Sequence, residues 1–327
     1  MRKFLKTWLD PYILAIVTTL VVGFNLPVGA GAAAFLNVAV QVAVGILFMV
    51  FGMRLSLTEV KDGLSNFRLQ GSVLVSTFLV FPLIGLLFYW VTLPLLGLSM
   101  AVGVLFLSLL PSTVQSSVAL IAIARGNVAA GIVSATVSNV LGIFITPLLV
   151  VLFIQIGGPD ASLAGLQGVL LNLLAPFILG QVLRRWTGSW IGANRRLATL
   201  LDKGVILLVV FKASSSAVGS VTITGRDVLL VVAVCGAMLA MILGATWLAG
   251  GLLKLGPEDR VVLLIAGSFK SLATGLPMAA IILPAEVAVW VAIPVIVYHQ
   301  LQLITCAIIA RRLAAKDQNL LGPTPQT

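Results

Sequence analysis

The run GSFKSLATGLP (Gly267 to Pro277) places a lysine in the middle of a segment otherwise built from Val, Leu, Ile, Ala and Met. A charge at the centre of a bilayer costs at least ~2.5–3.5 kcal/mol, so it is tolerated mainly where it faces a protein interior or a watery cavity. Lys270 is about 10 residues from either end of its segment, about 15 Å at helical rise, which is too far for its side chain to reach the headgroups. Lys270 is therefore the first candidate functional residue.

The composition around this segment is typical of a membrane protein. The 327 residues are 60% hydrophobic and 9% charged, with a mean hydropathy of +1.17, whereas a soluble domain carries about 25% charged residues. We predict an integral, multi-pass protein of the bacterial inner membrane, with the lipid bilayer as its partner. The formal charge of +10 is explained by Lys and Arg gathered in cytoplasmic loops, so no nucleic-acid partner is expected.

Apolar runs separated by charges or by Gly and Pro predict an all-α protein with ten membrane segments. With the amino terminus inside, every Lys and Arg except Lys212, Arg226 and Lys270 falls in or beside a cytoplasmic end, which predicts that both termini are cytoplasmic. Five segments in each half make the second half an inverted repeat of the first. We expect repeats at 1–157 and 158–313 and a disordered cytoplasmic tail at 314–327. The segments lie near residues 12–30, 35–54, 69–91, 97–124, 128–156, 163–184, 200–220, 228–253, 261–283 and 287–310.

Two segments in corresponding positions have polar, proline-marked centres. The fourth carries LLPSTVQSS (Leu109 to Ser117) and the ninth carries GSFKSLATGLP. Interrupted segments in corresponding halves are the best sequence indication of a transporter binding site. Pro111 removes a backbone donor and disfavours helix before it, and Gly275 and Pro277 are expected to loosen the ninth segment in the same way. If the ninth segment is helical, one stripe of it holds Gly267, Lys270, Ser271, Thr274 and Pro277.

The sequence is compatible with two roles for Lys270. Every Asp and Glu maps to a loop or the end of a segment, so no carboxylate pairs with the lysine at mid-depth. It can hold a fixed positive charge that attracts an anion, or gain and lose a proton during a transport cycle. The only histidine, His299, is either a hydrogen-bonded packing residue or a proton carrier. Hydrolase, phosphate-loop and dinucleotide motifs are missing from the sequence, so we expect no enzyme activity, no catalytic residues and no metal site.

The string LLPSTVQSSVALIAIARGNVAAGIVSATVSNVLGIFITPLL (Leu109 to Leu149) resembles the fourth and fifth helices of the bile acid:sodium symporter superfamily. The run GMRLSLTEV (Gly52 to Val60) resembles the end of that family's second helix. The resemblance implies ten helices in two inverted five-helix repeats. It also implies a core subdomain of helices 3–5 and 8–10, a panel subdomain of helices 1, 2, 6 and 7, and broken helices 4 and 9 that cross in mid-membrane.

The resemblance also implies where the sodium ligands of the family would lie in this sequence. Sodium-coupled members carry a Glu and a Gln on helix 9 as ion ligands, and the matching positions here hold Ser268 and Leu272, with Lys270 between them. The KSLATGLP run and YHQLQLI (Tyr298 to Ile304) are instead similar to the subfamily called SBF-like, which resembles vertebrate member seven of solute carrier family 10.

From these features we predict a secondary transporter that moves a small organic anion by alternating access, with Lys270 at the central site in place of sodium. Two alternatives stay open: a sodium-coupled symporter of bile acids or other organic anions, and a non-transporting membrane regulator on the same fold. No cofactor is expected, coupling to Na⁺ or H⁺ stays open, and the oligomeric state is not predicted. The predicted binding residues are Ser112, Thr113, Gln115, Ser116, Ser117, Ser138, Asn139, Lys270, Ser271, Thr274, His299 and Gln302.

Overall fold

The computed structural model describes residues 11–26, 28–55, 66–154, 168–216 and 224–321. These residues form helices and short connections and contain no strand, which confirms an all-α protein. The elements are α2 (Pro11–Asn25), α3 (Ala30–Arg54), α5 (Phe67–Val75), η1 (Ser76–Val80), α6 (Phe81–Leu109), α7 (Val114–Ile123), α8 (Val128–Phe153), η2 (Leu170–Leu174), α10 (Ala175–Ala193), α11 (Arg195–Ser216), α12 (Gly225–Leu252), α13 (Pro257–Ala266), α14 (Leu272–Ile282) and α15 (Ala285–Leu321).

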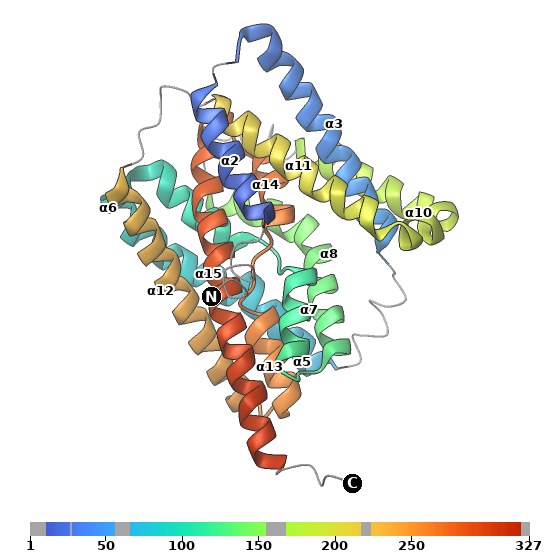
Figure 1. The fold of residues 1–327 in the computed structure, drawn as a ribbon, viewed down its shortest axis with the longest axis vertical. Coiled ribbons are helices and arrows are strands. Elements are labelled where there is room, and N and C mark those ends of the chain that lie inside the picture. Colours follow the sequence, from blue (N-terminus) through green and yellow to red (C-terminus); the bar gives the residue numbers. More distant parts are fainter. Residues whose placement is uncertain (1–10, 27, 56–65, 155–167, 217–223, 322–327) are drawn as a thin grey trace.

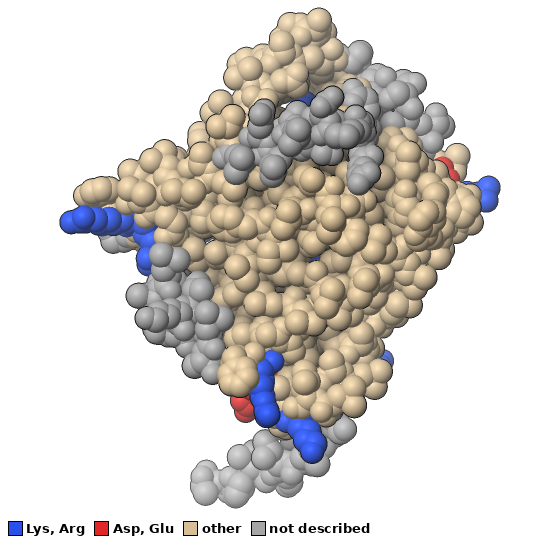
Figure 2. Space-filling model, turned by 180° about the vertical axis from the view of Figure 1, so that it is seen from behind, with Lys and Arg blue, Asp and Glu red and all other residues tan. Residues whose placement is uncertain are grey.

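The surface of the helices is suited to lipid. Large apolar side chains such as Phe35, Trp90 and Leu229 are exposed, and Figure 2 shows a broad face almost without charge, with Lys and Arg at its margins. Such a surface is expected where hydrocarbon replaces water as the solvent. The chain is therefore an integral membrane protein. In the described part of the chain, five helical stretches are long and apolar enough to span a bilayer: Ala30–Arg54, Phe67–Leu109, Val128–Phe153, Gly225–Leu252 and Val287–Ala315.

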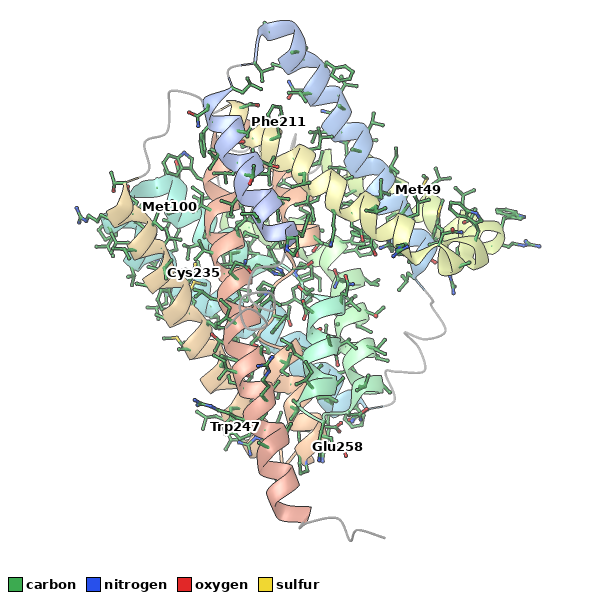
Figure 3. The ribbon with its side chains drawn as sticks, in the orientation of Figure 1. Met49, Met100, Phe211, Cys235, Trp247 and Glu258 are labelled. Atoms are coloured by element: carbon green, nitrogen blue, oxygen red, sulfur yellow. The ribbon has the colours of Figure 1, made fainter. Side chains whose placement is uncertain are left out.

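The helices pack in two groups (Figure 1). In the first group α3 packs along α10, and α11 contacts both α2 and α3. The backbones of α3 and α10 touch, because a Cβ at Gly180 would collide with the carbonyl of Met49, which is labelled in Figure 3. Glycine permits this close approach because it has no side chain.

In the second group α6, α12 and α15 pack on one another, and α7, α8 and α13 contact each other beside them. Cys235 of α12 lies in this interface, where its Sγ is 3.7 Å from the carbonyl oxygen of Pro294 on α15 (Figure 3). The two groups meet where α11 contacts α14 and α15.

The path from Phe67 to Leu109 is a helical hairpin rather than one straight helix. Within α6, Gly97 has φ +79°, in the left-handed region that glycine adopts without strain. The second limb returns beside the first, since a Cβ at Gly85 would overlap the side chain of Ser108. This hairpin brings Thr77 and Ser108 to the same depth.

The predicted fourth and ninth segments are each interrupted in the structure. Residues 110–113 separate α6 from α7, and residues 267–271 separate α13 from α14. Pro111 stands in the first interruption and Lys270 in the second.

Three sequence predictions are corrected here. The ninth segment is broken before Gly275 and Pro277, not at them, because Ser271 caps α14 by accepting a hydrogen bond from the backbone N–H of Thr274. The stripe through Lys270 is wrong for residues 267–271, which are not helical. α15 continues to Leu321, into the tail predicted to be disordered, because Ala, Lys, Gln and Leu favour helix until Gly322 and Pro323. Residues 322–327 and the 157/158 repeat boundary lie outside the described residues.

Candidate functional site

The Lys270 ammonium is held by three backbone carbonyls and one aromatic ring. Its Nζ donates to the carbonyl oxygens of Thr77 at 2.9 Å, Ser108 at 2.8 Å and Leu110 at 2.6 Å. The Phe81 ring lies 4.2 Å from Nζ, within cation–π range. Lys270 is 1% exposed, which rules out snorkelling to the membrane surface. The protein thus supplies the oxygen ligands that water would otherwise give to the ammonium.

Two prolines explain why the carbonyls of Thr77 and Ser108 are available. In η1, Phe81 N–H bonds to the carbonyl of Ser76 five residues earlier, and the next residue, Pro82, has no N–H to reach Thr77. At the end of α6, Pro111 cannot bond to Ser108, and the Ser112 N–H is taken by Ser138 Oγ. The carbonyls are therefore released from the helical ladder and would be costly to bury without a donor.

The two interruptions are also joined directly. Ser271 N–H donates to the Pro111 carbonyl at 2.8 Å. Ser112 Oγ donates to the Ala266 carbonyl at 2.7 Å, and Thr113 Oγ1 donates to the Lys270 carbonyl at 3.0 Å. The backbone groups that each interruption leaves without helical hydrogen bonds are thereby paired by the other interruption, as a membrane interior requires.

Side chains of α8 and α15 support this junction from either side. Ser138 Oγ accepts from Ser112 N–H at 3.0 Å, and Asn139 Nδ2 donates to the Ser112 carbonyl at 2.5 Å. Gln302 holds the backbone of Lys270 twice, accepting from its N–H at 2.9 Å and donating to its carbonyl at 3.0 Å. His299 Nδ1 lies 2.9 Å from Gln302 Nε2. The structure brings these four predicted residues to the junction in supporting positions.

The two serines at the start of α7 do not meet the Lys270 ammonium. Ser117 Oγ donates within its own helix, to the carbonyls of Thr113 and Val114. Ser116 Oγ is buried and has no hydrogen-bond partner among the described residues.

A cavity of about 930 Å³ opens next to the junction. Five predicted site residues line it, at the N-termini of α7 and α14 and on α8: Thr113, Gln115, Asn139, Ser271 and Thr274. Lys270 is not among the lining residues. The Lys270 Nζ is thus enclosed by backbone carbonyls and the Phe81 ring and lies apart from the lining of this cavity.

The charged side chains of the cavity are residues that the sequence places at or beside the ends of the predicted segments. Arg54 of α3, Arg184 and Arg185 of α10, and Asp202 of α11 all line it. Arg54 Nη1 lies 2.9 Å from Asp202 Oδ2. The positive-inside pattern marked these arginines only as ends of helices, so the sequence held no signal that they face a cavity.

The ligands of the ammonium were also missed. Backbone carbonyls leave no mark in a sequence, but the polar pair Ser76–Thr77 followed by Pro82 inside an apolar segment is a signal that could have indicated a local break.

Interrupted helices that meet inside a membrane bundle, beside a cavity lined by their N-termini, are typical of one class of proteins, the membrane transporters. The chain belongs to the SBF-like CPA transporter family, whose family model matches residues 10–315. It is therefore a transporter of the secondary type and not an enzyme.

Relatives support this assignment across the chain. It is 37% identical to the "Uncharacterized protein PA2026" of Pseudomonas aeruginosa, covering 94% of this chain and 93% of the relative. It is 35% identical to the "Putative symporter YfeH" of Escherichia coli K12, covering 95% of both. It is 26% identical to "Sodium/bile acid cotransporter 7" of Xenopus tropicalis, covering 80% of this chain and 78% of the relative.

Proposed function

We propose that this protein carries a small organic anion across the membrane by alternating access, and that the Lys270 ammonium stands where sodium-coupled relatives hold an ion. The observation that carries the proposal is the cage of three carbonyl oxygens 2.6–2.9 Å from Nζ. Backbone carbonyls that are free of helical hydrogen bonds coordinate the coupling cation in many transporters. A tethered ammonium fills that role without leaving the protein.

The electrostatics of the cavity support an anionic solute. The N-termini of α7 and α14 face it, and α7 has no side-chain cap, so partial positive charge and backbone N–H groups are presented to the solute. Three arginines and one aspartate line the same space. Fixed positive charge in the cavity comes from the arginines and the helix ends, while the charge of Lys270 interacts with the carbonyls of the junction.

The architecture that fits this cycle has ten crossings in two inverted repeats in the bacterial inner membrane, with both termini cytoplasmic. The panel is α2, α3, α10 and α11, and the core is α5–α8 with α12–α15. On the positive-inside rule the arginine end of the cavity is cytoplasmic, which makes this the inward-open state. Movement of the panel against the core would then close the cavity and open the opposite side.

The test is uptake into proteoliposomes of organic anions first identified by thermal stabilisation of the purified protein. We expect uptake of an anion to continue when Na⁺ is replaced by choline on both sides. Tight uptake of a cationic solute, or no flux of any solute, would contradict the proposal, and the second outcome would favour a regulator.

A second candidate is a sodium-coupled symporter, because relatives at 26% identity are named sodium/bile acid cotransporters. It predicts that uptake stops without a sodium gradient. The same assay with an imposed pH gradient tests coupling to H⁺.

A further inference from the structure

The cavity has two different polar regions on opposite groups of helices. One is formed by the N-termini of α7 and α14 in the second helix group, and the other by Arg184 and Arg185 on α10 in the first group. A ligand that fills the cavity therefore has to meet both.

At the first region a lining residue carries a buried hydroxyl without a partner. Thr274 is 3% exposed and its Oγ1 has no hydrogen-bond partner among the described residues. It lines the cavity in the first turn of α14, a helix of 11 residues. A buried hydroxyl without a partner is unfavourable unless a ligand or water completes it. An acceptor group such as a carboxylate would take this hydroxyl together with N–H groups at the start of α7, which has no side-chain cap.

At the second region the charges of two arginines are available to a ligand. Asp202 is the acidic residue of the cavity lining, and it pairs with Arg54. No carboxylate of the described residues forms an ion pair with Arg184 or Arg185. The stem of Arg184 lies over Gly188, where a Cβ would come 3.2 Å from Arg184 Cγ. Guanidinium groups bind carboxylate, sulfate and phosphate through paired hydrogen bonds.

The lining of the cavity also includes apolar side chains. Phe51, Ile143 and Phe177 line the cavity, and the Phe177 ring packs edge-on against Phe144 with centroids 6.4 Å apart. A volume of about 930 Å³ is at the upper end of cavities that hold organic ligands. The space therefore suits an apolar linker between two charged ends rather than a compact inorganic ion.

We infer that the solute is a dianion with two separated acidic groups, one bound at Thr274 and the helix N-termini and the other at Arg184 and Arg185. This inference rests on the proposed transport of organic anions and narrows it. Because the two groups of residues belong to different helix groups, a dianion bridges them, whereas a monoanion satisfies one and leaves the other uncompensated.

The experiment measures binding of adipate, sebacate and dodecanedioate to the purified full chain by thermal stabilisation, each beside its monomethyl ester. We expect at least one diacid to bind about tenfold more tightly than its ester, since a hydrogen-bonded charge pair is lost in the ester. Equal binding of every diacid and its ester would overturn the dianion inference while leaving anion transport intact. Binding of no organic anion in a wider screen would instead count against the proposed function as well.

A variant pair locates the second acidic group. In Arg184→Gln/Arg185→Gln the diacid should fall to the affinity of its ester, and the ester should change less than twofold. The matched control is Arg311→Gln/Arg312→Gln, which removes an adjacent arginine pair at an exposed position of α15 and should preserve the tenfold difference. A diacid preference that survives in the first variant contradicts the assignment to α10. The ester comparison on the unmodified chain decides the dianion inference even if that variant does not fold.

Discussion

The junction at Lys270 and the neighbouring cavity use basic side chains in opposite ways. At the junction the ammonium is 1% exposed and its donors are taken by carbonyls of Thr77, Ser108 and Leu110. In the cavity Arg184 and Arg185 line open space, and the buried Thr274 hydroxyl has no partner. Polar groups whose hydrogen bonds are all made within the protein form a rigid unit, whereas polar groups without a protein partner are available to a ligand. A basic residue in a membrane helix is thus understood from what its hydrogen-bond donors meet, not from its charge alone.

The largest effect is expected from removing the ammonium. Lys270→Met leaves three buried carbonyls without a donor, so we expect a loss of about 3 kcal/mol or more in the free energy of unfolding. Thermal or denaturant unfolding in detergent measures it. The matched control is Lys254→Met at an exposed position, which should change stability by about 0.5 kcal/mol or less. Equal behaviour of the two variants would mean that the cage does not stabilise the junction.

Gln302→Leu should come next. It removes the bonds to both the N–H and the carbonyl of Lys270, and the carbonyl keeps its bond from Thr113. The Lys270 N–H is left unpaired and His299 Nδ1 loses its contact with Gln302 Nε2, so we expect a cost of about 2 kcal/mol. Unfolding measured beside Lys270→Met, with the double variant, should give a non-additive result because the two residues share one network. Strict additivity would contradict a single junction.

Ser112→Ala tests the link between the two breaks. It removes the hydroxyl that donates to the Ala266 carbonyl, and the expected cost is about 1–2 kcal/mol. The variant keeps its backbone bonds to Ser138 and Asn139, so the fold should persist. A neutral result would indicate that water replaces the hydroxyl.

The smallest effect on stability is expected at Thr274. Its Oγ1 makes no hydrogen bond among the described residues, so Thr274→Val, which keeps the shape, should change the free energy of unfolding by about 0.5 kcal/mol or less, while binding of the transported anion weakens about tenfold. Stability and solute affinity measured on the same preparation separate the two regions. Loss of stability without loss of affinity would place Thr274 with the junction instead.

The sequence allowed much of this organisation to be predicted. The apolar segments, the polar interruption at Pro111 and the choice of Asn139 and Gln302 as site residues follow from residue type and spacing. The ninth segment was expected to loosen at Gly275 and Pro277, whereas the structure interrupts it earlier, at residues 267–271. The direction of the Lys270 side chain could not be predicted from the sequence. Its ligands are backbone carbonyls, which every residue has, and one of them is 193 residues away. The position of Arg184 and Arg185 in the cavity depends on how α10 packs against α3, which glycine contacts such as Gly180 with Met49 determine.

The most direct test of the central claim, that the Lys270 ammonium occupies a cation site, is the unfolding temperature of Lys270→Ala as Na⁺ is raised against choline at constant ionic strength. Alanine leaves the three carbonyls in place with room for an ion, and an ion that binds only the folded state raises stability by about 1.4 kcal/mol at ten times its Kd. We predict that Na⁺ stabilises the variant and leaves the unmodified protein unchanged. Equal responses of the two proteins to Na⁺ would contradict the claim.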